Sequence, residues 1–157
     1  MRASQFKDRV DALLCQGLAD LSMTLAVLAR IENNNYEIVA VQSNSGAYVA
    51  GEKYELGDSY SRDTFERQQI VAETNIEDAT QTLRHPLYRS LPLESYLGAP
   101  ITIDGEPWGC LDFSSMAQRE EEFSQQDLKL IGALASEISQ LLSSVEQASP
   151  RRQHAGG

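Results

Sequence analysis

The sequence predicts an α+β domain built on a central antiparallel sheet of five to six strands, with the two terminal helices on one face. Two observations predict this class. Apolar residues recur with helical spacing at both ends of the chain, and two pairs of apolar segments between them each enclose a polar turn. A long polar stretch separates the two pairs and must cover the other face of the sheet. Because an irregular segment packs less completely than a helix, this layer favours a pocket.

The first half of the chain is predicted to form a helix, a hairpin and a loop. Apolar side chains spaced by three and four residues indicate a helix over residues 4–21. An almost continuous apolar run at 23–31 follows, as in a strand that is covered on both faces. Polar residues 32–35 form a turn, and residues 36–42 return as the second strand. Residues 43–56 are rich in Ser, Gly and Asn and are predicted to be a loop.

The middle of the chain is predicted to hold a short helix at 60–68 and a short strand at 70–72, before the polar residues 75–91. A second hairpin follows, with its two strands joined by a type I′ turn signal: residues 95–103, Asp104-Gly105 and residues 107–114.

The last helix has the clearest start signal, because Ser124 and Asp127 fit a capping box. An apolar seam follows at spacings of three and four residues: Ile131, Leu134, Ile138, Leu141 and Val145. We expect this seam and the apolar face of the first helix to hold a homodimer as a four-helix bundle. The alternative is that the whole stripe is buried inside one chain. Residues 148–157 are predicted to be a disordered tail, so the single domain covers residues 1–147.

The net charge of −10 predicts which partners the protein avoids. A field of that sign repels phosphate backbones and anionic lipid, so we expect neither nucleic acid nor a membrane surface as a partner. The two cysteines, Cys15 and Cys110, make neither a disulfide framework nor a zinc site. The sequence has no secretory signal and no apolar run long enough for a membrane span. It therefore predicts a cytoplasmic protein with reduced thiols.

The order of elements, together with several short motifs, resembles the GAF domain family. The matching segments are residues 56–60 (LGDSY), 96–101 (YLGAPI), 104–105 (DG), 108–114 (WGCLDFS) and 123–128 (FSQQDL). The resemblance extends over about residues 5–146 and implies a sensory domain of bacterial signal transduction. Such a domain binds a small molecule and relays its state through the terminal helices to an output partner such as a histidine kinase or a diguanylate cyclase. The fold does not name the ligand, so the cofactor stays unknown.

Departures from known subfamilies exclude some ligands and reactions. Bilin-binding members carry an attachment cysteine usually followed by histidine, whereas here Gln16 follows Cys15 and Leu111 follows Cys110. The Asn-Lys-x-Phe-Asp type signature of the cyclic-nucleotide phosphodiesterase members is absent. The sequence has no Gly-x-Ser-x-Gly motif and no cysteine with an adjacent base, so we expect no enzyme activity. The alternatives are a thiol-dependent reductase similar to the free methionine sulfoxide reductases, and a dimerisation module without a ligand.

Six residues are predicted to line a pocket between the sheet and residues 56–91: Tyr60, Thr64, His85, Leu97, Cys110 and Asp112. Tyr60 and Thr64 lie one turn apart on the short helix, whose start can also hold an anion. Strand alternation places Asp112 on one face with Cys110 and Trp108. Some of these residues also have structural interpretations, namely Cys110 as a buried apolar side chain, His85 as a surface loop residue and Asp112 as the acceptor of a structural hydrogen bond.

Overall fold

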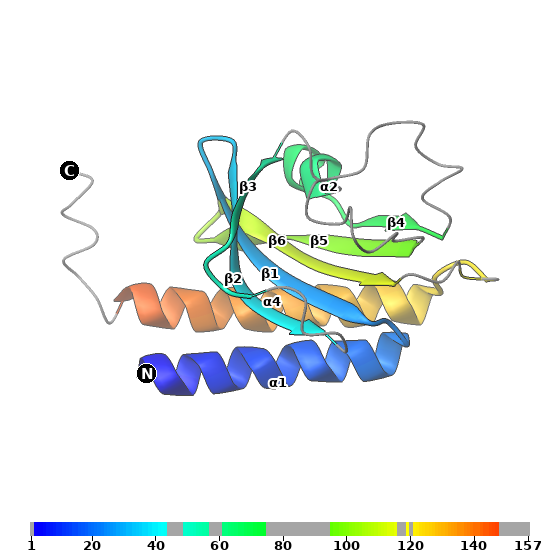
Figure 1. Ribbon diagram of the computed structural model, residues 1–157, viewed down its shortest axis with the longest axis horizontal. Coiled ribbons are helices and arrows are strands. Elements are labelled where there is room, and N and C mark those ends of the chain that lie inside the picture. Colours follow the sequence, from blue (N-terminus) through cyan, green and yellow to red (C-terminus); the bar gives the residue numbers. More distant parts are fainter. Residues whose placement is uncertain are drawn as a thin grey trace.

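A six-stranded antiparallel sheet with the strand order β3-β2-β1-β6-β5-β4 forms the centre of the molecule. This computed structural model describes residues 2–43, 49–56, 61–74, 95–115, 119 and 121–147. Helices α1 and α4 lie side by side against one face of the sheet, and the short helix α2 lies over the other face (Figure 1). The predicted α+β class and its layer order are therefore confirmed.

The first half of the chain forms one helix and three strands: α1 (Ala3–Leu21), β1 (Leu25–Glu32), β2 (Asn35–Ser43) and β3 (Lys53–Glu55). The β1–β2 hairpin turns at Asn33 and Asn34, whose φ angles of 52° and 64° suit a type I′ turn. Strand β3 corrects the predicted loop over residues 43–56, because it pairs with residues 35–37 of β2. Three residues are too few for their alternation to stand out from a polar loop.

The second half follows the prediction to within one or two residues at most element ends: α2 (Ser61–Arg67), β4 (Val71–Glu73), β5 (Ser95–Ile103), β6 (Glu106–Ser115) and α4 (Gln125–Gln147). The capping box is present, because the Ser124 N–H donates to Asp127 Oδ2 at 2.9 Å and the Asp127 N–H donates to Ser124 Oγ at 3.1 Å. No helix in the described ranges is both long and apolar enough to cross a membrane. The predicted tail, residues 148–157, lies outside the described residues.

A β-bulge corrects the predicted face of Trp108. Ile101 pairs with Gly109 while Thr102 pairs with Pro107, so Trp108 is an extra residue on β6. The extra residue reverses the alternation, and Trp108 packs on the helix-facing core instead of beside Cys110. The next residue, Gly109, has no room for a side chain, because a Cβ there would lie 1.9 Å from the Ala29 carbonyl oxygen of β1.

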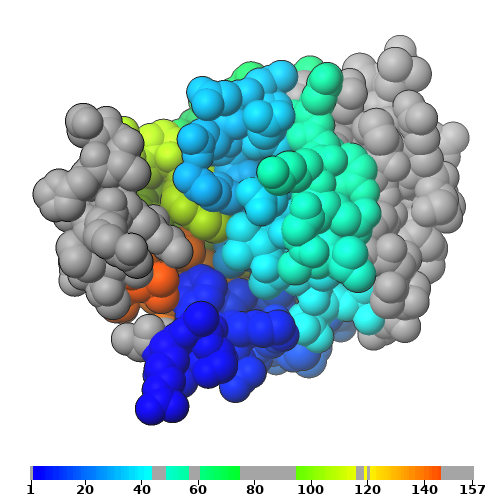
Figure 2. Space-filling model, turned by 60° about the vertical axis from the view of Figure 1, so that its left-hand side comes forward, coloured from blue at the N-terminus to red at the C-terminus, as the bar shows by residue number. Residues whose placement is uncertain are grey.

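The two faces of the sheet have separate cores. The core on the helix side joins α1 and α4 to Leu97, Leu111 and Phe113, and the core on the other side contains Tyr36, Tyr96 and Cys110. Helix α1 sits close to the sheet at Gly17, where a Cβ would lie 2.3 Å from the Phe113 ring. Figure 2 shows α1 (dark blue) below the β1–β2 hairpin (light blue), with the last described turns of α4 (orange) beside it.

The apolar seam that was predicted to join two chains is mostly buried inside one chain. Ile131, Leu134, Ile138 and Leu141 are all buried in the core that α4 shares with α1 and the sheet, and Val145 is half-buried. The alternative interpretation therefore holds for these four residues, since their side chains are not available to a second chain. The homodimer itself stays a prediction, and it would need other residues of the terminal helices.

Candidate functional site

A buried carboxylate lies at the centre of the sheet, on the face that α2 covers. Asp112 is on β6, between Val27 of β1 and Gly98 of β5, and it is 1% exposed. An ionised carboxylate in such a place needs hydrogen bonds to replace the water that it has lost.

Three hydroxyls from three different elements donate to Asp112. Its Oδ2 accepts from Ser61 Oγ of α2 at 2.5 Å and from Tyr36 Oη of β2 at 3.2 Å. Its Oδ1 accepts from Tyr96 Oη of β5 at 2.5 Å. Thr64 Oγ1 lies 2.9 Å from the same Tyr96 oxygen. Because Ser61 and Thr64 are three residues apart, they share one helix face, and both attach α2 to the sheet through polar contacts.

Gly98 is the residue that lets Tyr96 reach Asp112. Positions 96 and 98 point to the same face of β5, and Gly98 pairs directly with Asp112 on β6. A Cβ at position 98 would lie 2.1 Å from Tyr96 Oη and 2.6 Å from its Cζ. The absence of a side chain at Gly98 therefore leaves the space in which the phenol lies.

The three hydrogen bonds only partly offset the burial of Asp112. Burial raises the pKa of Asp112 from 3.8 to about 6, although the bonds from Ser61, Tyr96 and Tyr36 each lower it. Burial, and then the Asp112 charge, raise the pKa of Tyr96 well above its usual value. The same two causes raise the pKa of the Cys110 thiol, so this cysteine stays protonated.

The six predicted pocket residues have different outcomes. Thr64 and Asp112 belong to the network, and Cys110 lies beside it, with its Sγ 3.8 Å from the Ser61 carbonyl oxygen. Leu97 was placed on the wrong face: it alternates with Tyr96 and packs in the core under the helices, opposite Phe113. Tyr60 and His85, together with most of the segment predicted to cover the pocket, lie outside the described residues.

Three members of the network, Tyr36, Ser61 and Tyr96, are not among the predicted pocket residues. A signal existed for Tyr96, because it precedes Gly98 by two residues and so shares its face. Ser61 stands one turn before Thr64, which was predicted. Nothing local points to Tyr36, which is 76 residues from Asp112 in the chain.

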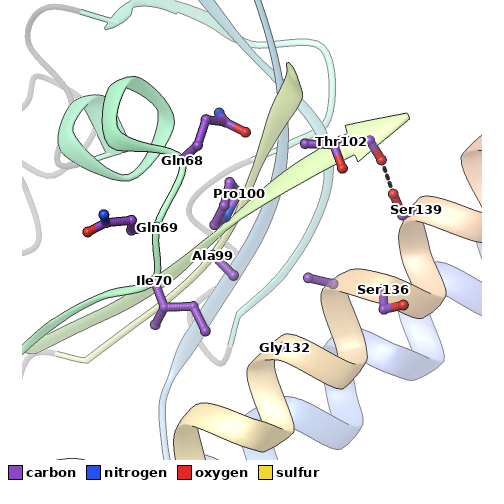
Figure 3. Close-up of a pocket in the computed structure, with 10 residues that line it drawn as sticks. Gln68, Gln69, Ile70, Ala99, Pro100, Thr102, Gly132, Ser136 and Ser139 are labelled. Atoms are coloured by element: carbon purple, nitrogen blue, oxygen red, sulfur yellow. Dashed lines mark hydrogen bonds between the residues drawn. The ribbon is translucent and has the colours of Figure 1, made fainter. Parts of the chain in front are cut away.

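A second feature is an open groove at the outer edge of β5. Its volume is about 360 Å³, and it lies between β5, α4 and the link from α2 to β4. Figure 3 shows Pro100 and Thr102 of β5 on one side, Gly132, Ser136 and Ser139 of α4 on the other, and Gln68 to Ile70 closing it. The Ser139 hydroxyl donates to the Thr102 carbonyl oxygen. Of the predicted ligand residues that the structure describes, Thr64, Leu97, Cys110 and Asp112, none lines this groove.

The part of the chain that the structure describes contains no candidate metal site. No group of three His, Cys, Asp or Glu side chains is placed there so that it could hold a metal ion.

Comparisons with known proteins agree with this architecture. A sequence profile described as GAF domain matches residues 7–143. No curated protein sequence matches the chain significantly. Among solved structures, the GAF domain of a two-component sensor histidine kinase from Bacillus halodurans has a TM-score of 0.68 at 16% identity, covering 88% of this chain and 96% of that chain.

Two further structures are similar over most of their length. The blue-light absorbing form of the Thermosynechococcus elongatus PixJ GAF domain has a TM-score of 0.73 at 20% identity, covering 98% of this chain and 96% of that chain. The type II free methionine-R-sulfoxide reductase from Thermoplasma acidophilum has a TM-score of 0.72 at 17% identity, covering 90% and 94% respectively. At these identities the likeness establishes the fold alone.

Proposed function

This chain belongs to the GAF domain family, and on that premise we propose that it is a sensory domain that binds a small molecule between α2 and the sheet. The observation that carries the proposal is the buried Asp112 network. Ser61 and Thr64 of α2 and Tyr36 and Tyr96 of the sheet converge there through hydroxyl groups. The core on this face is otherwise apolar, so these polar groups are the ones that a ligand with hydrogen-bonding atoms can engage.

Helix α2 is the element that we expect to respond to the ligand. It has seven residues, too few to be stable on its own, so its position depends on what it contacts. A ligand that carries hydrogen-bond donors can satisfy Asp112 in place of Ser61, because one hydrogen bond then replaces another at small net cost. A ligand that binds one position of α2 better than another shifts the population toward that position.

The terminal helices are the proposed output. Strands β5 and β6 carry Tyr96 and Asp112 on the α2 face, and they carry Leu97 and Phe113 on the face that packs against α1 and α4. A movement of these strands therefore reaches both helices. The start of α1 and the described end of α4 lie at the same end of the molecule, where one partner can contact both (Figure 1). We propose a cytoplasmic bacterial setting, a homodimer through outward residues of these helices, and an output partner such as a histidine kinase or a diguanylate cyclase.

We propose that the domain has no enzyme activity, although a reductase shares its fold. The nucleophile of thiol chemistry is the thiolate, and both burial and the neighbouring Asp112 disfavour a thiolate at Cys110. Cys15 is exposed on α1, in the layer on the other side of the sheet. A sulfoxide and peroxide turnover assay, with Cys110→Ser as control, tests this. Turnover that disappears in Cys110→Ser would favour the reductase.

The binding proposal is tested by native mass spectrometry of protein purified from its own host, followed by NMR titration with the molecule that is retained. We expect shifts of backbone amides at Ser61, Thr64 and Tyr96, and weaker binding to Asp112→Asn. Leu111, on the opposite face of the same strand, is the internal reference. No retained molecule, together with no shift on titration with a library of nucleotides, amino acids and carboxylic acids, would contradict the proposal. Shifts confined to the groove beside Pro100 would contradict the position of the site.

A further inference from the structure

We propose that Arg119 couples the end of β4 to both terminal helices, so that a displacement at one of these elements changes the stability of the others. The proposal deepens the proposed function by naming a route of relay, and it rests on that function only for the meaning of the signal. Figure 1 shows that the end of β4, the end of α1 and the start of α4 lie at the same end of the molecule.

The backbone of Arg119 contacts the end of β4. Its N–H donates to the carbonyl oxygen of Thr74 at 3.2 Å. Thr74 directly follows β4, the edge strand of the sheet, which pairs with β5 at residues 96–98. This stretch of β5 includes Tyr96, which donates to Asp112, and Gly98, which pairs with Asp112 across the sheet. A change at the candidate site is therefore one strand away from Arg119.

The side chain of Arg119 contacts both terminal helices. Its Nη1 donates to the carbonyl oxygen of Leu21, the last residue of α1, at 3.1 Å. The last carbonyls of a helix have no partner inside the helix and carry a partial negative charge. The last turn of α1 has no basic residue of its own, so Arg119 supplies the positive charge from another part of the chain.

The second helix is reached through the capping carboxylate. Arg119 Nη2 lies 3.5 Å from Asp127 Oδ2, the same oxygen that accepts the Ser124 N–H at the start of α4. The guanidinium carbon lies 4.1 Å from the centre of the Phe123 ring. The two charged side chains are 23% and 20% exposed, so solvent screens this pair less than it screens the ion pairs on the open surface.

One donor of Arg119 is left over. Its Nε is buried and has no hydrogen-bond partner among the described residues. The contacts of the guanidinium that carry the coupling are therefore those of Nη1 with the Leu21 carbonyl and of Nη2 with Asp127.

The test is a double-mutant cycle read by NMR-detected amide exchange, with no ligand required. Asp127→Asn, a substitution on α4, should speed exchange of the β4 amides (Val71–Glu73) by about two- to fivefold in the wild-type background, the effect of a partly exposed ion pair. In the Arg119→Ala background the same substitution should have no further effect on β4. The coupling predicts this effect on β4 because Arg119 connects α4 to β4. If Asp127 acted only at the cap of α4, its substitution would leave exchange of the β4 amides unchanged.

The matched control is Arg9→Ala, because Arg9 also joins α1 to α4, through an ion pair with Glu137 at 3.0 Å whose side chains are 57% and 45% exposed. This variant should leave the effect of Asp127→Asn on β4 intact. If Arg119→Ala does not fold, Arg119→Gln replaces it in the same cycle. Additive effects on β4, or an effect of Asp127→Asn confined to α4, would overturn the coupling. A positive cycle in a protein that binds no molecule would uphold the coupling while removing the sensory role.

Discussion

Replacing Asp112 by Asn should change how the stability of the protein depends on pH. The substitution keeps the shape of the side chain and removes its titration. In the folded protein the pKa of Asp112 is about 6, above its usual 3.8, because burial penalises the charged form. The folded state therefore binds this proton more tightly than the unfolded chain. The corresponding stability is fully present below pH 3.8 and is lost as the pH rises through about 6.

The size of the effect follows from the two pKa values. A difference of about two pKa units corresponds to about 3 kcal/mol of unfolding free energy. Asp112 is 1% exposed, so solvent does not screen this penalty. All other groups titrate in both proteins. The stability of the wild type minus that of Asp112→Asn should therefore fall by about 2.5 kcal/mol between about pH 4 and about pH 7, which is most of the full difference.

The measurement is urea unfolding of both proteins at a series of pH values across this range. Asp104→Asn is the control for the general effect of an Asp-to-Asn change, because Asp104 is an exposed turn residue with a positive φ that Asn also adopts. A wild-type minus Asp112→Asn difference that is constant with pH, or that rises with pH, would refute the reasoning. A constant difference would mean that the hydroxyls of Ser61, Tyr36 and Tyr96 offset the burial of the charge, and a rising one would mean that they outweigh it.

Three other predictions follow from the packing. Gly98→Ala should lower the unfolding free energy by about 1–3 kcal/mol, because its Cβ displaces Tyr96 Oη from its two hydrogen bonds; urea titration beside Tyr96→Phe measures it, and an unchanged midpoint would contradict it. Leu141→Glu should lower the unfolding free energy by at least about 2 kcal/mol, because it buries a charge in the core of one chain. Sedimentation of the wild type at tens of micromolar tests the homodimer, and a monomer under these conditions would rule it out. Co-expression with a bilin pathway should give a colourless protein after denaturing purification, and a chromophore bound to Cys15 or Cys110 would overturn that expectation.

Much of the fold could be predicted from the sequence because its signals are local. The bounds of β5 were predicted to the residue, since SYLGAPITI ends at an Asp-Gly turn. The start of α4 follows from the Ser124 and Asp127 pair, whose reciprocal bonds need only four consecutive residues. Strand β3 was missed because its pairing with β2, and not its own three residues, makes it a strand.

The candidate site was predicted only in part, because it depends on contacts between distant segments. Asp112 could be identified as a carboxylate in an apolar strand, and the need for a partner follows from that. Its partner Ser61 lies 51 residues away in the chain, and no local pattern brings the two together. Leu97 and Trp108 were assigned to the wrong face, the first because its neighbour Tyr96 occupies the site and the second because a bulge shifts the alternation by one residue.

The groove beside β5 also has a consequence for how the protein behaves at high concentration. Among the described strands, β4 covers β5 only at residues 96–98, so the rest of that edge could template a strand from another molecule. Pro100 has no N–H to offer such a strand. The carbonyl oxygen of Thr102, two residues on and directed to the same side, already accepts a hydrogen bond from the Ser139 hydroxyl. At residues 100 and 102 the edge thus lacks one donor and has one acceptor occupied, which disfavours pairing with a strand of another molecule there. Ser139→Ala would free the Thr102 carbonyl oxygen, and Pro100 alone would then oppose such pairing.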